Sequence, residues 1–279
     1  ARGLVCKNEF YRNAKGFDGL GLGYGVVVYG DNNQWVANPK LGSNNFIFID
    51  TETTGLRGSK VEQLTQISAI RTEFDYDSNT INELDFYDRK IKLTNKTLER
   101  ISEQEKIEMK WKIKDVLELN HYYKDNNKCY DEKRTLSDFH KWSHQNIKDV
   151  KVMQHSKFDL DMLNGRHKHN FDSNILDTKI IIQLFFIPSI QKLAEKSSKY
   201  KKMLDDIGTS DRDNGLISSS MSKVGPVLGL DMNMYHNSLS DCRITINMFL
   251  RIMEFLKNNL NLDIKRYQEE RISRKKVYS

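Results

Sequence analysis

Runs of apolar residues in the first half of the chain predict three neighbouring strands. The four consecutive apolar residues at 46–49 are typical of a strand buried on both faces, and residues 66–74 form a second strand-like run. A short polar turn leads to a third run at 81–93. Short turns join the first strand to the second and the second to the third. We therefore expect these three strands to form an antiparallel sheet at the beginning of the domain.

Apolar residues at helical spacing predict helices farther along the chain. A charged segment at 97–120 carries an apolar stripe, and another helix opens at Thr135. A short strand at 150–153 turns directly into a helix, and a strongly apolar helix follows Ser238. The stripe of the first helix consists of Leu98, Ile101, Ile107, Trp111, Val116 and Leu119.

Residues 1–43 differ in composition from the rest of the chain. Glycines crowd residues 16–25, and the segments 26–29 and 34–36 flank a Gly-Asp-Asn-Asn turn that predicts a β-hairpin. The glycine spacing does not match G-x-G-x-x-G, so a nucleotide loop is a poor interpretation. We expect an N-terminal glycine-rich and hairpin extension that docks a partner or the substrate.

The remainder is expected to form one main domain, 44–257, followed by a basic C-terminal tail, 258–279. Within it, residues 188–234 form a variable insert with a helix, a mobile polar loop and a second short helix from Met221 to Leu228. The tail could contact phosphates or remain a solvated end.

The composition of the chain limits which binding partners and which cellular compartments are expected. The net charge of +6 favours a polyanionic partner, and 38% apolar residues are enough for a core. The three cysteines, Cys6, Cys129 and Cys242, are scattered, so neither a disulfide framework nor a zinc cluster is indicated. No apolar run is long enough to span a membrane, and the first residues lack the pattern of a signal peptide. We expect no membrane partner and a reducing intracellular compartment: cytoplasm, nucleoid, nucleus or organelle matrix.

Two carboxylates end the first strand. Asp50 and Glu52 are spaced i, i+2, so their side chains leave the same face of the strand. Adjacent like charges at the edge of a core are costly unless a cation neutralises them, and oxygen ligands suit Mg²⁺ or Mn²⁺. A solvated strand end is the alternative. It is weakened by the tight turn Thr54-Gly55-Leu56, which pushes an apolar side chain outward.

Two further acids and a histidine are candidates. Asp159 falls in the first turn of a helix, where the helix dipole favours a carboxylate and where capping is the alternative function. Asp241 follows His236 by five positions, and such positions diverge by about 140° on a helix. Asp241 is therefore expected on the helix, and His236 on the loop that enters it.

Three segments carry a resemblance to a known family. Residues 50–56 match D-x-E-T-T-G-L in full, and His155, Phe158 and Asp159 match H-N-x-x-F-D with Ser156 in place of Asn. His236 and Asp241 match H-x-A-x-x-D with Ser238 in place of Ala. The chain thus resembles the histidine-bearing (DEDDh, DnaQ-like) branch of the DEDD superfamily of 3′→5′ exonucleases. The segment 174–182 resembles the strand and helix start that follow the second motif in this family.

The resemblance implies a ribonuclease-H-like α/β fold, a mixed five-stranded sheet flanked by helices. It also implies phosphodiester hydrolysis with two Mg²⁺ or Mn²⁺ ions held by four acids, and a histidine that takes the proton of the attacking water. In this sequence the acids are Asp50, Glu52, Asp159 and Asp241, and the histidine is His236.

The same resemblance implies substrate-binding positions. Those around the 3′-terminal nucleotide are Thr53, Thr54, Gly55, Leu56, His155, Ser156 and Phe158. Leu56 and Phe158 would pack on bases, since such contacts tolerate any sequence. Ser156 stands where the family motif has Asn, and His155 is a better candidate for a structural function than for a catalytic one.

The expected activity is 3′→5′ exonuclease action on single-stranded or frayed 3′ ends, with release of nucleoside 5′-monophosphates. DNA, in proofreading or repair, is the first choice of substrate, and an RNA-trimming or oligoribonuclease-like enzyme is the alternative. A catalytically silent nucleic-acid-binding scaffold is an alternative of another class. The activity could also serve a polymerase or processing complex that binds residues 1–43.

Overall fold

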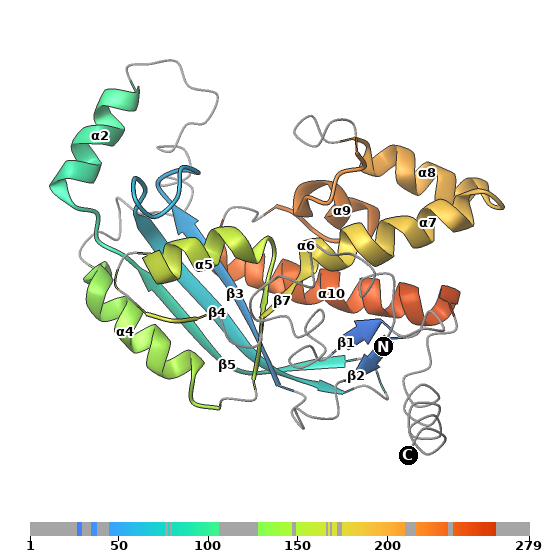
Figure 1. The fold of residues 1–279 in the computed structure, drawn as a ribbon, viewed down its shortest axis with the longest axis horizontal. Coiled ribbons are helices and arrows are strands. Elements are labelled where there is room, and N and C mark those ends of the chain that lie inside the picture. Colours follow the sequence, from blue (N-terminus) through green and yellow to red (C-terminus); the bar gives the residue numbers. More distant parts are fainter. Residues whose placement is uncertain are drawn as a thin grey trace, which may run out of the picture.

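The computed structural model describes residues 27–29, 35–37, 45–75, 78, 80–105, 128–146, 149–165, 167, 169–171, 175–209, 216–233 and 237–260. All structural statements below concern these residues. Five strands form one mixed sheet in the order β5-β4-β3-β6-β7, and a separate pair, β1-β2, lies outside it (Figure 1).

The first three strands of the large sheet are antiparallel, as the short turns predict. They are β3 (Asn45–Thr53), β4 (Leu64–Asp75) and β5 (Thr80–Lys90). On the other side of β3 lie β6 (Val150–Met153) and β7 (Ile175–Asp177), both parallel to it. The expected mixed five-stranded sheet is confirmed, with β3 at its centre.

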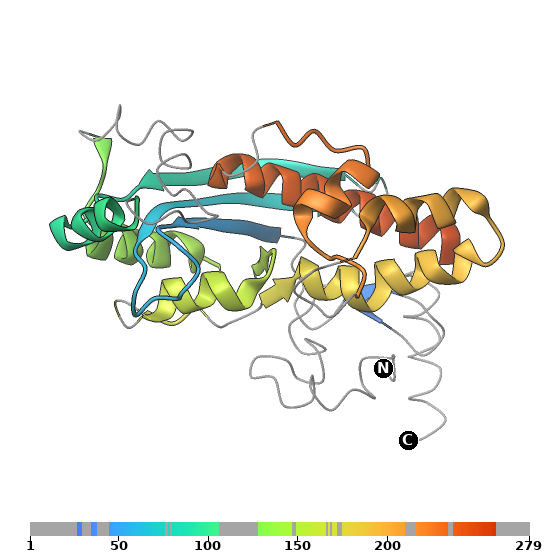
Figure 2. The same cartoon turned by 90° about the horizontal axis from the view of Figure 1, so that it is seen from above.

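Helices cover both faces of the sheet, as Figure 2 shows. Alternate residues of β3 divide between the two layers. Phe46 and Phe48 pack in the cluster on the side of α10 (Ser238–Leu260), and Ile47 and Ile49 in the cluster on the other side. Helices α4 (Glu132–Ser143) and α5 (Ser156–Gly165) form that second layer. Burial on both faces explains why β3 has no polar alternation before Asp50.

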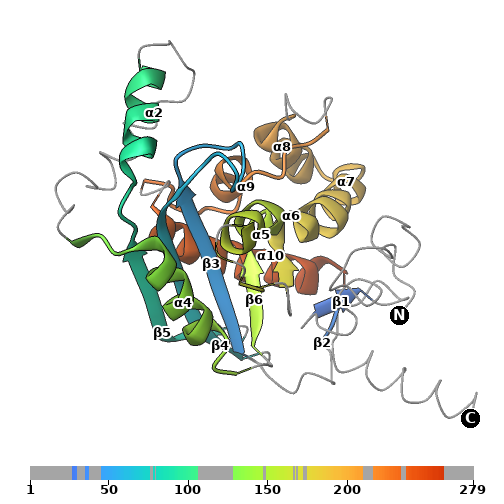
Figure 3. The ribbon, with the colours of Figure 1, turned by 60° about the vertical axis from the view of Figure 1, so that its left-hand side comes forward.

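The remaining helices follow β5 and β7. They are α2 (Asn95–Glu105), α6 (Thr178–Ile181), the π-helical turn η3 (Ile182–Phe186), α7 (Ile187–Ala194), α8 (Ser198–Ile207) and α9 (Met221–Val227). Figure 3 shows α7, α8 and α9 grouped together beside the sheet. The wide turn of η3 comes just before Pro188, which lacks the backbone N–H that a regular helix would use.

Some boundaries differ from those expected. The helix expected to open at Thr135 begins at Glu132, because the side chain of Asp131 caps it by accepting from the Arg134 N–H at 2.9 Å. The strand-like run 81–93 stops at Lys90, and Ile91 makes an isolated bridge to Tyr130. The segment 188–207 contains two helices, α7 and α8, where one was expected.

Several predicted segments lie only partly within the described residues. Helix α2 ends at Glu105, and residues 106–120 of the predicted helix 97–120 lie outside the described residues. The predicted N-terminal hairpin is present as β1 (Val27–Tyr29) paired antiparallel with β2 (Trp35–Ala37). Helix α10 continues to Leu260, past residue 257. The polar loop 210–215 and residues 261–279 also lie outside the described part.

No helix among the described residues is long and apolar enough to cross a membrane.

An aromatic group fixes α10 on the sheet. The ring of Phe249, almost fully buried, lies 5.7, 6.0 and 6.2 Å from the rings of Phe46, Phe48 and Phe74. Spacings of this kind are favourable for aromatic pairs. Since α10 also carries Asp241, this packing sets the position of a candidate site residue.

We predict that Phe249→Ala lowers the free energy of unfolding by about 3–5 kcal/mol, because it leaves a cavity among three rings. Phe86→Ala is the matched control, since Phe86 on β5 is 58% exposed, and its effect should stay within about 0.5 kcal/mol. Denaturant titration measures both. Equal losses in the two variants would contradict the proposed packing of α10.

Candidate functional site

The end of β3 presents two carboxylates on one face. Asp50 and Glu52 stand on the α10 side of the strand, opposite Ser68 and Gln66 of β4 in the antiparallel register. The register shifts between Glu52 and Thr53, where the strand ends. The i, i+2 spacing therefore places both side chains in one region, as the sequence predicts.

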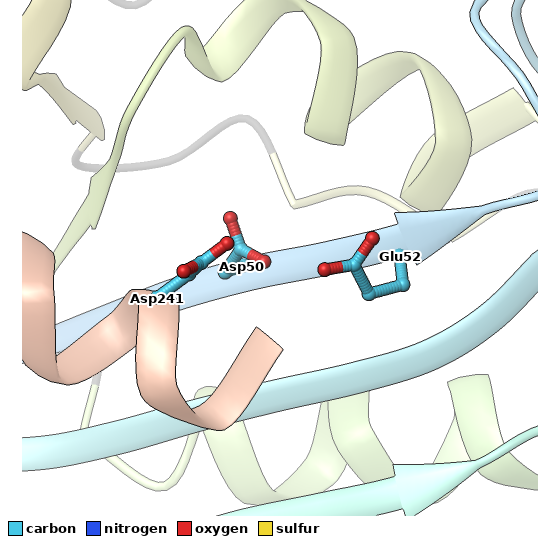
Figure 4. Close-up of side chains that lie close together, drawn as sticks. All are labelled: Asp50, Glu52 and Asp241. Atoms are coloured by element: carbon cyan, nitrogen blue, oxygen red, sulfur yellow. The ribbon is translucent and has the colours of Figure 1, made fainter. Parts of the chain in front are cut away.

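Asp241 reaches the same region from the first turn of α10. Its backbone N–H donates to the Asn237 carbonyl at 2.8 Å, and the Asn237 side chain accepts from the Ser240 N–H at 3.2 Å, which caps the helix. Figure 4 shows the carboxylate of Asp241 beside those of Asp50 and Glu52. One oxygen from each of the three lies within 4.8 Å of the others.

The three carboxylates destabilise one another's charge. Burial, and then the charges of Asp241, Asp159 and Glu52, raise the pKa of Asp50 well above its usual value. Burial, and then the charges of Asp241 and Asp159, raise the pKa of Glu52 to about 8. A divalent cation would relieve this repulsion, and an all-oxygen donor set is the one that Mg²⁺ and Mn²⁺ prefer. The residues therefore fit a hard divalent ion.

Asp159 lies beside this group and is not among the three residues whose oxygens converge in the described part of the chain. It is buried in the first turn of α5, and Thr51 donates to its Oδ1 at 2.7 Å. Burial raises the pKa of Asp159 to about 7, although the hydrogen bond from Thr51 opposes the shift. Its charge acts on Asp50 and Glu52, so the four acids form one electrostatic unit.

The turn before α5 is organised by Asp177 at the end of β7. Its carboxylate accepts from the N–H of His155 at 3.1 Å, the N–H of Ser156 at 2.8 Å and the N–H of Lys179 at 2.9 Å. The hydroxyl of Ser156, which stands where the H-N-x-x-F-D motif has Asn, also donates to the Asp177 carboxylate at 2.9 Å. His155 is exposed and has a left-handed backbone (φ +69°). Asp177 therefore fixes the turn that delivers Asp159.

The start of α10 is held through a similar polar chain. The Ser238 hydroxyl, fully buried, lies 2.5 Å from that of Ser68, which donates to Asp88 at 2.7 Å. Gln66 donates to the same oxygen of Asp88 at 2.8 Å. The serine that replaces the usual alanine thus connects α10 to β4 and β5. His236 lies outside the described residues, so its predicted place on the loop before α10 stays a prediction.

The segment after β3 forms a compact turn with an exposed tip. Thr53 donates to the Gly55 carbonyl at 2.8 Å, Thr54 is buried, and the side chain of Leu56 is 58% exposed. Phe158, the other residue expected to pack on bases, is half-buried. The apolar tip predicted from the sequence is present.

Sequence reasoning missed several residues that support the site. The sequence could have indicated Thr51. It lies between Asp50 and Glu52 on a strand, so its side chain must face the opposite layer, where α5 lies. Asp177 and Asp88 had no such signal, since their partners lie far away in the sequence or depend on how the loops fold.

Comparison with known proteins gives a likeness to solved structures. No family model matches the sequence, and no curated protein matches it. Among solved structures, the zinc-bound form of E. coli exonuclease I in complex with single-stranded DNA superposes with a TM-score of 0.51 at 13% identity. The expected ribonuclease-H-like α/β fold is confirmed. At this identity the likeness shows the fold alone.

That alignment covers 78% of this chain and 42% of exonuclease I, so the chain spans less than half the length of that protein. Two looser likenesses carry no weight of their own. E. coli exonuclease I with a dT13 oligonucleotide has a TM-score of 0.48, with 14% identity over 78% of this chain and 42% of that one. Cell-death related nuclease 4 has a TM-score of 0.38, with 12% identity over 76% and 64%.

We predict that the metal-free protein loses stability as the pH rises from about 4.5 to about 8. The pKa of Glu52 is about 8 in the folded protein and about 4.5 in the unfolded chain. Between these two pH values the folded protein binds more protons than the unfolded chain does, so its stability is greatest below this window and falls as the pH rises through it. Asp241→Asn should raise the melting temperature in EDTA at pH 8 by about 2–4 °C or more, because one repelling charge is removed. Mg²⁺ should raise that of the wild type and not of the variant.

Thermal unfolding at several pH values measures both effects. Asp138→Asn, on the exposed side of α4, is the control and should follow the wild type. Curves for wild type and Asp241→Asn that run parallel from pH 4.5 to pH 8 would contradict the shared charge repulsion.

Proposed function

We propose that this chain is a metal-dependent 3′→5′ exonuclease that hydrolyses single-stranded or frayed 3′ ends, with DNA as the preferred substrate, and releases nucleoside 5′-monophosphates. One observation carries the proposal. Three carboxylates from two separate segments have oxygens within 4.8 Å of one another at the end of the central strand of an exonuclease-like fold. Such an arrangement is costly for folding and is suited to binding divalent cations.

The acidic residues would act as ligands. Asp50, Glu52 and Asp241 would hold one divalent ion, and Asp159 together with Asp50 a second. When bound, two such ions stabilise charge on the attacking and the leaving oxygen of a phosphodiester. The protein's own contribution is to keep these carboxylates buried and fixed. Thr51 does so for Asp159, and the cap at Asn237 does so for Asp241.

His236 is the proposed general base. It directly precedes Asn237, the residue whose side chain caps α10, so the chain connection keeps it near the first turn that carries Asp241. An imidazole titrates near neutrality and can take the proton of a water as that water attacks.

The turn after β3 is the proposed contact for the terminal nucleotide. Thr53, Thr54 and Gly55 shape the turn, and the exposed side chain of Leu56 would pack on a base opposite Phe158. Such apolar contacts do not depend on base identity. His155 is exposed at the neighbouring turn and could approach the same nucleotide, whereas the hydroxyl of Ser156 is directed to Asp177.

The choice of DNA over RNA rests on the fold neighbour, exonuclease I in complex with single-stranded DNA. A silent scaffold is disfavoured because the four acids persist at a cost in stability. The β1–β2 hairpin, the part of residues 1–43 that the structure describes, gives no support to a polymerase partner.

We predict that Asp50→Ala and Asp241→Asn each reduce the Mg²⁺-dependent release of mononucleotides by roughly 10²–10³-fold, since each removes a ligand worth several kcal/mol in the transition state. The assay follows 5′-labelled single-stranded DNA, duplex DNA and RNA with Mg²⁺, Mn²⁺ or EDTA. A ladder that shortens from the 3′ end reports polarity, and the three substrates report preference.

Asp138→Asn is the control and should keep wild-type activity. Full activity in either site variant, or equal activity in EDTA, would reject the proposed metal-dependent reaction.

We also predict that His236→Ala slows turnover at neutral pH by about 10²–10⁴-fold, the usual contribution of a general base, while binding of single-stranded DNA changes little. Single-turnover rates and fluorescence anisotropy in EDTA separate the two quantities. A loss of binding as large as the loss of rate would argue against proton transfer by His236.

A further inference from the structure

A buried carboxylate lies at the centre of the turn after β3. Glu62 is only 1% exposed, and Arg57 donates to its Oε1 at 2.8 Å. Arg100 of α2 donates to its Oε2 at 2.7 Å, and Thr54 donates to the same oxygen at 2.8 Å. Arg100 also donates to the Thr54 hydroxyl at 2.8 Å. We call these four residues, Thr54, Arg57, Glu62 and Arg100, the Glu62 clamp.

The clamp carries a surplus of positive charge. Burial raises the pKa of Glu62, but hydrogen bonds from Arg57 and Thr54 and the charge of Arg100 lower it below its usual value, so Glu62 is ionised at neutral pH. Two guanidinium groups thus share one carboxylate, which gives a formal charge of +1 when the four clamp residues are counted by themselves. The clamp stands only a few residues from a cluster of four acids.

The clamp is rigid because the turn is fixed on both sides. A Cβ at Gly55 would lie 2.8 Å from the Glu62 carboxyl group, so the carboxylate packs where a side chain would be. On the other side, the Ser59 N–H donates to Asp161 of α5 at 2.8 Å. Gly58 has φ +85°, and a Cβ there would lie 2.7 Å from Asp161 Oδ2. Cationic groups held in this way lose little entropy when they bind a ligand.

The guanidinium of Arg57 remains accessible while it contacts Glu62. Its side chain is 55% exposed, whereas that of Arg100 is 22% exposed and that of Glu62 is 1% exposed. Arg57 directly follows Leu56, whose apolar side chain is 58% exposed. A guanidinium beside an exposed apolar side chain is a combination that suits the backbone and the bases of a single strand.

Arg57 lies within reach of such a strand. Arg57 follows Glu52 by five residues, so it cannot lie more than about 18 Å along the chain from the acidic cluster. A strand whose terminal phosphate reaches the acids would have its next phosphates within this range.

We propose that the Glu62 clamp is a phosphate-binding site for the strand whose 3′ end enters the acidic cluster, with Glu62 orienting Arg57 and Arg100 and Arg57 contacting the backbone. The inference rests on the proposed function for the identity of the ligand, a single-stranded nucleic acid. It assigns positioning to Glu62 and backbone contact to Arg57.

The first test compares Arg57→Gln with Arg251→Gln. Arg251 on α10 is 59% exposed and pairs with Glu254, so the two substitutions remove equal charge at similar exposure. Anisotropy of 5′-fluorescein dT12 and U12 is measured in EDTA between 50 and 200 mM NaCl, conditions under which the strand is bound without hydrolysis. Arg57→Gln should weaken binding about tenfold and reduce the slope of log K against log salt by about 0.7. Arg251→Gln should leave both unchanged.

The second test uses Glu62→Gln, which raises the net charge by one. If net charge alone determined affinity, this variant would bind dT12 more tightly. If Glu62 orients the two arginines, the variant should bind dT12 more weakly, because Arg57 and Arg100 lose the carboxylate that holds them. The Mg²⁺-induced rise in melting temperature shows whether the fold and the acidic cluster persist in this variant. If it does not fold, the Arg57→Gln comparison decides alone.

An unchanged salt slope in Arg57→Gln, or tighter binding by Glu62→Gln, would overturn the clamp. Wild-type protein that degrades DNA while Arg57→Gln binds normally overturns the clamp and leaves the exonuclease intact. Wild-type protein that binds strands through Arg57 without degrading them supports the clamp and rejects the exonuclease. Failure of the wild type to bind either oligonucleotide overturns both. Equal effects on dT12 and U12 support a contact with the shared phosphate backbone.

Discussion

Repulsion between buried carboxylates is the constraint on which the candidate site depends. Asp50, Glu52 and Asp241 converge within a few ångströms, and Asp159 adds its charge from the side. Nothing in the packing of the sheet requires acids at these positions, and each raises the free energy of the folded state when it is ionised. The arrangement makes physical sense when cations share the space, which is why the site supports a metal-dependent reaction more strongly than the fold alone does.

The surrounding polar contacts keep this unfavourable arrangement in place. Thr51 holds Asp159 from the opposite face of β3, and Asp177 fixes the turn that precedes it. Ser238 connects α10 to the sheet through Ser68 and Asp88. These contacts join β3, α5 and α10, so the position of each acid is determined by hydrogen bonds as well as by apolar packing. Cys242, next to Asp241, is fully buried. Burial, and then the charges of Asp50, Asp241, Asp159 and Asp88, raise the pKa of its thiol, which is therefore expected to be chemically inert.

Local rules of the chain were sufficient to predict much of this. Strand alternation placed Asp50 and Glu52 together, and helical geometry placed Asp241 on α10, because both depend only on neighbours in the sequence. The mixed five-stranded sheet came from the resemblance, and the structure confirms it. The start of α4 was misplaced because Asp131 caps it through a side chain that carried no apolar signal. Contacts such as Glu62 with Arg100, or Ser68 with Ser238, join distant residues and exist only after the chain has folded.

The contact between Gly55 and Glu62 has a consequence for how such sequences can diverge. The glycine leaves the space that the carboxylate occupies, and the carboxylate in turn is needed by two guanidinium groups. An alanine at 55 would therefore collide with the Glu62 carboxylate, and the φ of +158° at this position would strain it even without Glu62. Divergence at position 55 is thus restricted twice, by the backbone and by the carboxylate that the side chains of residues 57 and 100 contact.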